Sequence, residues 1–370
     1  MKVLVLGGTG AIGRHLVDIL ISKGNAVVVT SRKEHTNKPN VEYIIGDAHN
    51  LEFIKSILKK NKYDTIVDFM SYKTEEFRNR YQLYLKSCNQ YVFLSSARVY
   101  ADVGNNLITE QTPRLLDVCK NKEYLKTDEY ALTKARQEDL LFECKEKNWT
   151  IIRPYITYSE IRLQLGVLEK EFWLYRALQG KSIVFSKDIM ENYTTLTYGK
   201  DVSAAIESLL GKKEAMGEAF HITGEETLKW KDVLRLYINT IEKTTSIRPK
   251  IILTEKSTRI KFPEAKWQVI YDRYFNRKFN NHKIGRFFDL QSFKKPEEGL
   301  VQCLNIFLHT PQYNVINWKS EAYFDALCNE YAIPTDINNK DKITYNLYRR
   351  IPYLIYLDIL KQKIKMTIKG

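Results

Sequence analysis

The stretch Lys2-Val-Leu-Val-Leu-Gly7-Gly-Thr-Gly10-Ala-Ile-Gly13 decides the fold of this chain. A short apolar run ends abruptly in glycine, and apolar residues then recur at helical spacing from Ile12 to Leu20. This predicts a strand that enters a helix through a tight turn. Such a turn offers a pyrophosphate backbone N–H groups and a helix N-terminus, and glycines leave room for its approach. We therefore expect a dinucleotide to bind along Gly7, Thr9, Gly10, Ala11, Ile12 and Gly13. An ordinary strand-to-helix turn is the alternative, because G-x-x-G-x-x-G alone is a weak signal.

The second apolar run, Ala26 to Val29, ends where a Rossmann fold places the residue that reads the adenosine ribose. A carboxylate there would accept hydrogen bonds from both ribose hydroxyls and repel a 2′-phosphate. The chain instead has Ser31, Arg32 and Lys33, which favour that phosphate. We therefore expect NADP as the cofactor, with NAD possible. The alternative is that the two cations are solvated loop charges.

A third apolar run, Val41 to Ile45, closes on Gly46-Asp47-Ala48. Asp47 could accept a hydrogen bond from the adenine amino group, and Ala48 lies beside it in the expected cofactor site. A surface turn is the equal alternative for Asp47.

The segment Tyr130-Ala-Leu-Thr-Lys134 places a phenol and an ammonium on one face of a helix, since residues four apart are neighbours. The ammonium can lower the pKa of a neighbouring phenol, which makes a tyrosinate usable as an acid or base near neutral pH. Upstream, an apolar run from Gln90 leads to Ser95 and Ser96, at the strand end where an α/β sheet places its ligands. Ser96 could hydrogen-bond a substrate hydroxyl or carbonyl beside the phenol.

Strands and helices alternate through residue 155, with a helix expected at Leu51 to Lys60, a strand at Thr65 to Phe69 and a helix at Glu75 to Ser87. This rhythm predicts a doubly wound, parallel α/β sheet of Rossmann type with a smaller C-terminal α/β substrate lobe. The expected limits are 1–155 plus parts of 195–225 for the dinucleotide-binding domain, 156–310 (discontinuous) for the substrate lobe, and 311–370 for a helical extension.

Taken together and in this order, the motifs resemble the extended short-chain dehydrogenases/reductases, the branch with nucleotide-sugar epimerases, dehydratases and ketoreductases. The resemblance covers roughly residues 1–310 and is strengthened by Ile152-Arg153-Pro154, Thr197-Tyr-Gly-Lys-Asp201-Val202 and Glu218-Ala-Phe-His-Ile-Thr-Gly224. It implies that Tyr130 is the acid/base, that Lys134 binds the nicotinamide ribose, and that Ser96 polarises the substrate. A homodimer is also implied.

The resemblance further leads us to expect substrate contacts from Ser96, Arg98, Tyr155, Tyr193 and Arg273. Arg273, like Arg277 and Lys283, lies where the family often binds the diphosphate. A solvated face is nevertheless the simpler expectation for any one of these three cations.

The chain departs from the family pattern in two places. Family dehydratases carry an Asp-Glu pair directly after the catalytic serine or threonine, whereas this chain has Ala97 and Arg98, which argues against dehydration. The segment between Ser96 and Tyr130 is longer than usual and inserts Leu115 to Thr127 near the expected sugar site. That insertion is either a substrate lid or a surface addition.

We therefore expect an epimerase or 4-ketoreductase that uses NAD(P) on a nucleotide-activated sugar, in the synthesis of surface polysaccharide or glycan precursors. The alternative is a non-catalytic Rossmann protein with a regulatory or RNA-binding role. Against it, Ser96, Tyr130 and Lys134 are all present, and no cluster of arginines interleaved with aromatics indicates a nucleic-acid face.

The formal net charge of the 370 residues is +14, and most of the surplus lies in residues 241–370. A basic lobe suits a nucleotide diphosphate, but equally nucleic acid or an anionic membrane surface. The run from Arg349 to Lys365 could be a basic amphipathic helix on a membrane, although packing on its own domain or on a partner subunit is the commoner role.

The five cysteines form no C-x-x-C pair, and no signal peptide precedes the first strand, so we expect a reduced, cytoplasmic setting. The six histidines show no metal-ligand spacing, so we expect no metal.

Overall fold

The computed structural model describes residues 1–36, 39–260, 265–331, 337–355 and 357–358. They form two compact units. The first comprises residues 1–159, 194–228 and 277–299, and the second comprises the described parts of 160–193, 229–276 and 300–370. Residues 277–299 thus return to the first unit, and the described residues beyond 311 group with the second.

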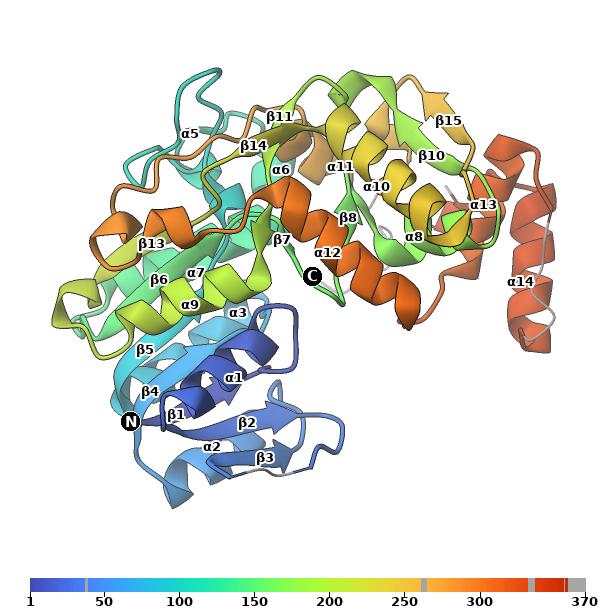
Figure 1. Cartoon of the computed structure of the whole chain (residues 1–370). Helices are drawn as coiled ribbons and strands as arrows, with labels where there is room; N and C mark the ends of the chain where they lie inside the picture. Colours follow the sequence, from blue (N-terminus) through green and yellow to red (C-terminus); the bar gives the residue numbers. More distant parts are fainter. Residues whose placement is uncertain (37–38, 261–264, 332–336, 356, 359–370) are drawn as a thin grey trace. The chain divides into compact units, whose positions relative to one another are not determined.

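A seven-stranded parallel sheet forms the first unit (Figure 1). Its order is β13 (Glu218–Ile222), β6 (Trp149–Pro154), β5 (Cys88–Leu94), β4 (Tyr63–Asp68), β1 (Lys2–Leu6), β2 (Ala26–Ser31) and β3 (Val41–Ile45). The winding reverses between β1 and β4, so the topological switch point lies at the carboxyl ends of these two strands. The expected doubly wound α/β fold is confirmed.

The inner strands of this sheet are buried on both faces, which is why they read as largely apolar runs, whereas the edge strand β3 is exposed at Glu42 and Ile45. Val3 and Val5 of β1 belong to one apolar cluster, and Leu4 and Leu6 belong to another. Neighbouring strands keep this alternation, because Val3 pairs in parallel with Val27 of β2.

Helices cover both faces of the sheet. The first cluster contains the apolar sides of α1 (Gly13–Ser22) and α9 (Gly199–Leu209), which lie side by side in Figure 1. The second contains residues of α2 (Leu51–Lys60), α3 (Thr74–Arg78), α4 (Tyr81–Lys86) and α7 (Tyr130–Glu143). Shorter elements are β7 (Thr157–Tyr158), which pairs with β12 (Thr197–Tyr198), and the 3₁₀ turns η1 (Ala97–Val99), η3 (Lys213–Ala215), η6 (Ile284–Arg286) and η7 (Leu290–Ser292).

The single helix expected at Glu75 to Ser87 is two helices, because the chain breaks at Arg80. The Arg80 side chain is buried, and its guanidinium donates to the backbone oxygens of Ala48 and His49, both at 3.0 Å. A residue that must turn inward to reach the loop after β3 cannot stay on the exposed face of a continuous helix.

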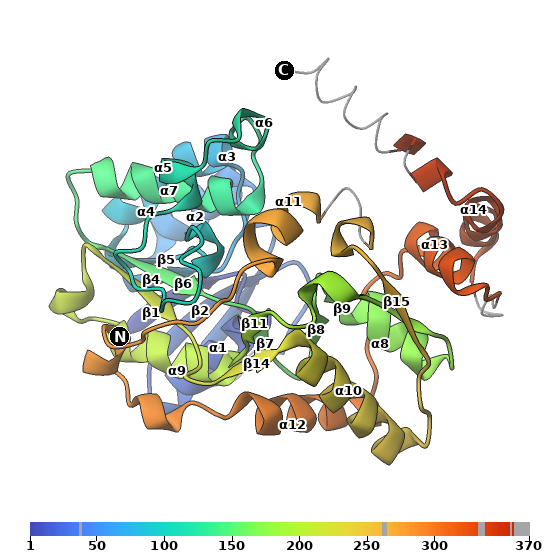
Figure 2. The same ribbon diagram turned by 90° about the horizontal axis from the view of Figure 1, so that it is seen from above.

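The inserted segment forms α5 (Leu115–Val118) and α6 (Lys122–Leu125), and α5 packs beside α7 (Figure 2). Arg136 of α7 donates to the backbone oxygens of Leu125 and Thr127 at 2.6 and 2.7 Å. The insertion is therefore attached to the helix that carries Tyr130.

The second unit contains α8 (Lys170–Leu178) and α10 (Trp230–Thr245), whose side chains Trp173 and Tyr237 stack with ring centroids 4.5 Å apart. In Figure 2, α13 (Trp318–Cys328) lies beside α14 (Asn339–Arg350). The remaining elements include β8 (Gln164–Leu165), β9 (Leu168–Glu169), β10 (Ile183–Ser186), β15 (Ile251–Thr254), α11 (Lys266–Gln268), the 3₁₀ turns η2 (Lys187–Ile189) and η4 (Ser257–Arg259), and the short π-helix η5 (Val269–Arg273). β11 (Tyr193–Thr195) pairs with β14 (Thr227–Lys229), and α12 (Pro296–His309) begins in the first unit and continues in the second.

Within the described ranges, no helix has the length and apolar character needed to cross a membrane. The basic amphipathic helix expected from Arg349 to Lys365 lies partly outside the described residues, at 356 and 359–365. In the described part, α14 ends at Arg350 and residues 352 and 353 form a turn, so the expectation of one continuous helix from Arg349 is wrong there.

Candidate active site

The three motif glycines have three different surroundings in the loop between β1 and α1. Gly7 adopts φ +68°, and its N–H donates to the Thr30 hydroxyl at 3.1 Å. A Cβ on Gly13 would lie 2.7 Å from the Gly8 Cα, so Gly13 allows the helix to pack against the loop. A Cβ on Gly10 would meet only the Gly7 oxygen, at 4.0 Å. Gly10 therefore faces open space, as a residue beside a ligand must.

The N-terminus of α1 suits an anion. Its N-cap residue, Ile12, has no side-chain cap, and the first turn carries no acidic residue. Thr9 is exposed and Ala11 is half-buried on the same loop. Uncapped N–H groups at the positive end of a helix dipole attract negative charge, so this end fits the pyrophosphate of a dinucleotide.

The residues expected to read the adenosine ribose lie at the end of β2. Thr30 and Ser31 are buried, whereas Arg32 and Lys33 are exposed. The Ser31 hydroxyl accepts the Lys33 N–H at 3.1 Å and lies 3.1 Å from His35 Nε2. Arg32 and Lys33 are thus both exposed cations directly after β2.

Asp47 and Ala48 follow β3, next to the end of β2. Asp47 is exposed, and its Oδ1 accepts the His49 N–H at 3.0 Å, whereas Ala48 is buried. The Gly46 N–H donates to the Ser31 backbone oxygen at 2.9 Å, which brings the two loops together. The candidate adenine and ribose contacts are therefore neighbours.

Ser95 and Ser96 follow β5 and face different surroundings. Ser95 is fully buried, and its hydroxyl donates to Glu138 Oε1 at 2.6 Å. Ser96 begins the short turn η1, where its Oγ accepts the Arg98 N–H at 3.2 Å. Ser95 therefore braces the fold, and Ser96 remains the candidate for contact with a substrate.

Tyr130 is the first residue of α7 and has 39% of its surface exposed, whereas Lys134 on the next turn is 2% exposed. The Lys134 Nζ lies 5.9 Å from the centroid of the Tyr130 ring and donates to the Leu94 backbone oxygen at 2.8 Å. The structure thus brings Lys134 to the carboxyl end of β5, close to both the phenol and the serine turn.

Lys134 is an ammonium in a buried position, and burial lowers its pKa to about 8. The carboxylates of Asp68 and Glu138 oppose this effect. Asp68 itself is fully buried at the end of β4, and burial raises its pKa to about 6. Near neutral pH the two groups favour each other's charged form.

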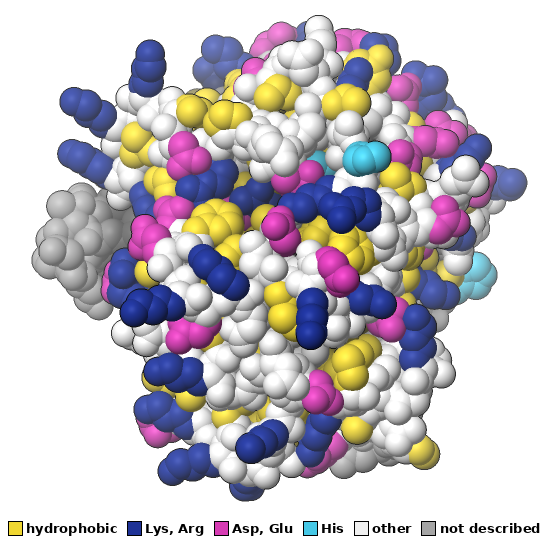
Figure 3. All heavy atoms as spheres, turned by 90° about the vertical axis from the view of Figure 1, so that its left-hand side faces the viewer, with side chains coloured by type: hydrophobic (Ala, Val, Ile, Leu, Met, Phe, Trp, Pro, Cys, Tyr) yellow, Lys and Arg dark blue, Asp and Glu magenta, His cyan; other side chains and the backbone are white. Residues whose placement is uncertain are grey.

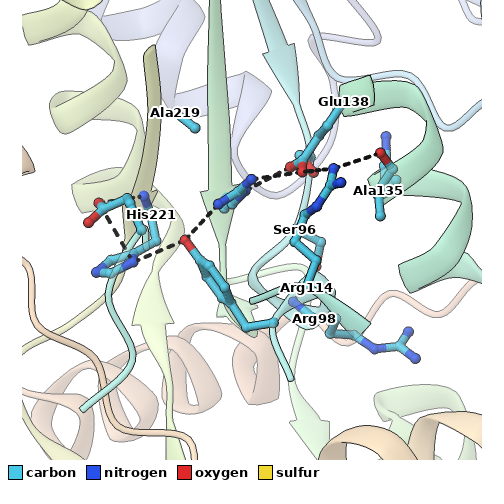
Figure 4. A network of polar contacts seen from close by, with 12 residues as sticks. Ser96, Arg98, Arg114, Ala135, Glu138, Ala219 and His221 are labelled. Carbon is cyan, nitrogen blue, oxygen red and sulfur yellow. Dashed lines mark hydrogen bonds and ion pairs between the residues drawn. The ribbon is translucent and has the colours of Figure 1, made fainter. Parts of the chain in front are cut away.

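Behind the serine turn, a buried network crosses the first unit (Figure 4). Arg153 of β6 donates to both oxygens of Glu138, at 2.7 and 2.8 Å, and to the Tyr100 hydroxyl at 3.0 Å. The Tyr100 hydroxyl lies 3.4 Å from Nδ1 of His221, whose pKa is lowered by burial. Arg153 thus links α7 to β13.

Asp68 and Glu138 are not among the site residues expected from the sequence. Glu138 carries a readable signal, because it lies four residues after Lys134 and thus on the same face of α7. Asp68 has no such signal, since only the pairing of β4 with β5 brings it near Lys134.

The expected substrate contacts divide between the two units. In the first, Arg98 lies with its guanidinium carbon 5.4 Å from the centroid of the Tyr130 ring, and Tyr155 is buried with its ring centroid 5.4 Å from that of Phe279. In the second, the Tyr193 N–H donates to Asn276 Oδ1 at 2.9 Å. Arg98 is thus brought beside Tyr130.

The expectation of a solvated face is wrong for two of the three cations considered for a diphosphate. Arg273 is buried in the second unit, where its Nε donates to the Gly166 oxygen at 2.9 Å and it contacts Asp272. Arg277 is buried in the first unit, and burial lowers its pKa. Lys283 is partly exposed and forms an ion pair with Glu218 at 2.6 Å.

Among the described residues there is no group of three or more His, Cys, Asp or Glu side chains that could hold a metal ion, and the five cysteines are free thiols.

The arrangement fits a nicotinamide dinucleotide. Gly10 and the uncapped end of α1 would hold the pyrophosphate, and Lys134 would hold the nicotinamide ribose. A phenol that is partly exposed beside a buried ammonium can exchange a proton with a hydroxyl next to it.

Solved structures share this fold. A dTDP-glucose 4,6-dehydratase from Bacillus anthracis, solved in complex with NAD, superposes with a TM-score of 0.64 at 19% sequence identity, covering 84% of this chain and 97% of that one. At this level of identity the likeness concerns the fold.

Sequence relatives include both a binding protein and enzymes. The chain is 27% identical over 241 residues to the chloroplast stem-loop binding protein of 41 kDa b from Arabidopsis thaliana. This match covers 61% of this chain and 59% of that protein. It is also 31% identical over 135 residues to a UDP-glucose 4-epimerase from Lactobacillus helveticus, and this match covers 30% of this chain and 41% of the enzyme. The chain therefore matches less than two thirds of the length of each relative.

The model of the NAD dependent epimerase/dehydratase family matches residues 3–223, which contain the glycine loop, the serine turn and the Tyr130 helix. This is more than half of the chain and includes all seven strands of the parallel sheet. The chain is a member of the NAD-dependent epimerase/dehydratase family.

Proposed function

We propose that this protein uses NAD(P) to oxidise or reduce a hydroxyl-bearing carbon of a nucleotide-activated sugar, with Tyr130 as the acid/base. The observation that carries the proposal is the placement of Tyr130 beside the buried Lys134, at the strand end that also presents Ser96. The similarity to UDP-glucose 4-epimerases supports a sugar nucleotide as the substrate class.

The bound cofactor would supply the hydride acceptor or donor at the sugar carbon. The chain's own groups would move the proton. Tyr130 takes the proton from the sugar hydroxyl during oxidation and returns it during reduction, and Lys134 stabilises the charge on the phenolate. Ser96 donates a hydrogen bond to the same sugar oxygen and fixes its position.

Epimerisation and 4-ketoreduction use the same residues, and they differ in whether the cofactor ends in its starting redox state. In place of the acid-base pair that dehydratases carry, the chain has Ala97 and Arg98, so we exclude dehydration from the proposal. We further propose that NADP is preferred over NAD. Directly after β2 the chain has the exposed Arg32, which can bind a 2′-phosphate, where an NAD-specific site would have a carboxylate that repels it.

The test follows absorbance at 340 nm for the purified full-length chain with NADPH or NADH and a panel of 4-keto and 4-hydroxy nucleotide sugars. Loss of absorbance with a keto sugar identifies a ketoreductase, and interconversion of hydroxy sugars without a net change identifies an epimerase. Tyr130→Phe is expected to lower kcat by about 10²- to 10⁴-fold. Tyr353→Phe, at an exposed tyrosine of the second unit, is the matched control. Turnover that survives Tyr130→Phe would refute the mechanism.

Cofactor preference has its own test. Arg32→Ala is expected to raise the Kd for NADPH about tenfold or more, since an exposed arginine loses its charge-assisted hydrogen bonds to the phosphate. The Kd for NADH should change little. Equal changes for both cofactors would contradict the NADP preference.

RNA binding is the second candidate, favoured by the similarity to the chloroplast stem-loop binding protein and by the net charge of +14. On the face shown in Figure 3, however, acidic side chains lie among the lysines and arginines. A gel-shift titration with a stem-loop RNA at two salt concentrations distinguishes the candidates. Submicromolar binding at physiological salt would favour this role, because sequence-independent contacts with phosphates weaken steeply as salt rises.

A homodimer is proposed from the family resemblance alone, and light scattering on the purified protein tests it.

A further inference from the structure

Two features of the first unit, Arg98 and the inserted helices α5 and α6, take no part in the proposed proton transfer. Arg98 stands where dehydratases carry the Glu of their Asp-Glu pair, and the chain inserts α5 and α6 between Ser96 and Tyr130. The structure connects the two features through Glu129, the residue before Tyr130.

The cationic side chains of Arg98 and Lys134 both lie near the ring of Tyr130. The guanidinium carbon of Arg98 lies 5.4 Å from the centroid of the Tyr130 ring, and the Lys134 Nζ lies 5.9 Å from it. A cation this close to a phenol ring favours it modestly while it is neutral, and favours it much more once it carries a negative charge.

Glu129 fixes the position of Arg98. Its Oε1 accepts the Arg98 Nη2–H at 2.5 Å, while its Oε2 accepts the Ala131 N–H at 2.8 Å as the N-cap of α7. The Arg98 backbone N–H in turn donates to the Ser96 hydroxyl oxygen at 3.2 Å. Arg98 is therefore held between the serine turn and the first turn of the tyrosine helix.

The inserted segment completes this arrangement. The hydroxyl of Tyr124, a fully buried residue of α6, donates to Glu129 Oε2 at 3.1 Å. Burial and the Glu129 charge both raise the pKa of the Tyr124 phenol, so this hydroxyl stays protonated and remains a donor. Arg136 of α7 holds the end of the insertion through its hydrogen bonds to Leu125 and Thr127. The segment around Tyr124 is therefore fastened to α7, which favours a structural role over that of a substrate lid.

We propose that Arg98 is a positioning residue for Tyr130: held by Glu129 and by Tyr124 of the insertion, it keeps a permanent positive charge beside the phenol that exchanges the proton. The proposal deepens the proposed function and rests on it for its catalytic meaning. Its physical reason is that a guanidinium stays charged at every pH at which the enzyme would work, whereas the buried Lys134 ammonium loses its charge within that range.

The test measures the titration of Tyr130 itself, by NMR of the full-length chain labelled with ¹³Cζ-tyrosine, with the Tyr130 signal assigned from Tyr130→Phe. Arg98→Gln keeps hydrogen-bonding capacity toward Glu129 and removes the charge, whereas Arg98→Lys keeps the charge. Arg136→Gln is the matched control, because it removes an arginine that braces the same insertion from α7.

Arg98→Gln is expected to raise the midpoint of the Tyr130 titration by roughly half to one pH unit, as Coulomb attraction at about 5 Å in a partly exposed site implies. Arg98→Lys should restore most of the shift, and Arg136→Gln should leave the midpoint unchanged. Tyr124→Phe should give a smaller shift in the same direction. An unchanged midpoint in both Arg98→Gln and Tyr124→Phe would overturn the proposal, as would an equal shift in Arg136→Gln.

The outcome is separable from that of the proposed function. If the wild-type chain turns over a nucleotide sugar, one limb of its kcat/KM pH profile should move with the Tyr130 midpoint in Arg98→Gln. This is the acid limb for oxidation of a hydroxy sugar, in which the phenolate accepts a proton, and the alkaline limb for reduction of a keto sugar, in which the phenol donates one. If no substrate is turned over, the proposed function fails while the NMR titration still decides the role of Arg98.

Discussion

Glu138 and Arg153 form a bidentate ion pair in the interior of the first unit, with N–O distances of 2.7 and 2.8 Å and both side chains almost completely buried. Glu138 comes from the helix that carries Tyr130 and Lys134, and Arg153 comes from β6. The pair therefore ties the candidate catalytic helix to the sheet. Ser95 donates to the same carboxylate and adds the end of β5 to the cluster.

Removing Glu138 should be strongly destabilising. Glu138→Gln leaves the Arg153 guanidinium buried without its counter-charge, and we expect the free energy of unfolding to fall by about 3–5 kcal/mol. Urea denaturation measures the loss. The double variant Glu138→Gln/Arg153→Met should lose less than the single variant, because it buries no unpaired charge. A double variant that is less stable than Glu138→Gln would contradict this explanation.

The glycine loop permits a matched pair of substitutions. Gly10→Ala should fold with near wild-type stability, because its Cβ meets nothing closer than 4.0 Å, yet it should weaken NAD(P) binding about tenfold or more by filling the space beside the loop. Gly13→Ala should lower the melting temperature, since its Cβ would lie 2.7 Å from the Gly8 Cα. Thermal melting and cofactor fluorescence titration separate the two effects. Equal melting temperatures for both variants would show that the loop packs differently.

Asp68 should make stability depend on pH in the acidic range. Burial raises its pKa to about 6 in the folded chain, above the value of about 4 expected when unfolded, so the folded state binds the extra proton between these values. Its contribution is present below about pH 4 and is lost as the pH rises through 6, at most about 3 kcal/mol. Asp68→Asn should remove this part of the slope, which urea denaturation at pH 4.5 and 6.5 measures. An unchanged slope would place the titration on another group.

Lys134 should give the opposite slope at alkaline pH. Burial lowers its pKa to about 8, below the unfolded value of about 10.4, so the cost of burying its charge disappears as the pH rises through 8. Stability should therefore rise between about pH 8 and 10 relative to Lys134→Met, which lacks the titrating group. Parallel curves for the two proteins would show that Lys134 stays charged in this range.

The second unit contains its own buried charge cluster, which attaches α13 to α8. Arg176 is fully buried and donates to Glu321 at 3.0 Å, to Asp325 at 2.7 Å and to Glu330 at 2.8 Å. Arg176→Met should destabilise the second unit by several kcal/mol and release α13 to proteolysis. Limited digestion with a protease that cleaves after glutamate, followed by mass spectrometry, detects the new cleavage sites, because neither substitution adds or removes a glutamate. Arg235→Met, at an exposed arginine of α10, is the control that should leave the digest unchanged.

The sequence was a good guide to the elements whose signal is local. The strand Lys2–Leu6 and the helix Leu51–Lys60 have the expected bounds, because each is defined by its own apolar periodicity and by residues that end it. The helix expected at Glu75 to Ser87 is divided in the structure because Arg80 turns inward to the loop after β3, a contact that periodicity does not express.

The sequence by itself determined the parallel sheet and the family. Both are readable because glycine placement specifies a turn, and apolar spacing specifies the buried face of a helix or strand, through residues that are only a few positions apart in the sequence. It also indicated Ser96, Tyr130 and Lys134 as the candidate catalytic residues, whose roles stay a prediction. The tertiary structure alone decided the charges around them. Asp68 lies near Lys134 because β4 pairs with β5, and Tyr124 and Arg98 both donate to Glu129. The burial of Arg273 and Arg277 was likewise beyond the sequence, because the cost and the compensation of a buried charge depend on groups that lie far away along the chain.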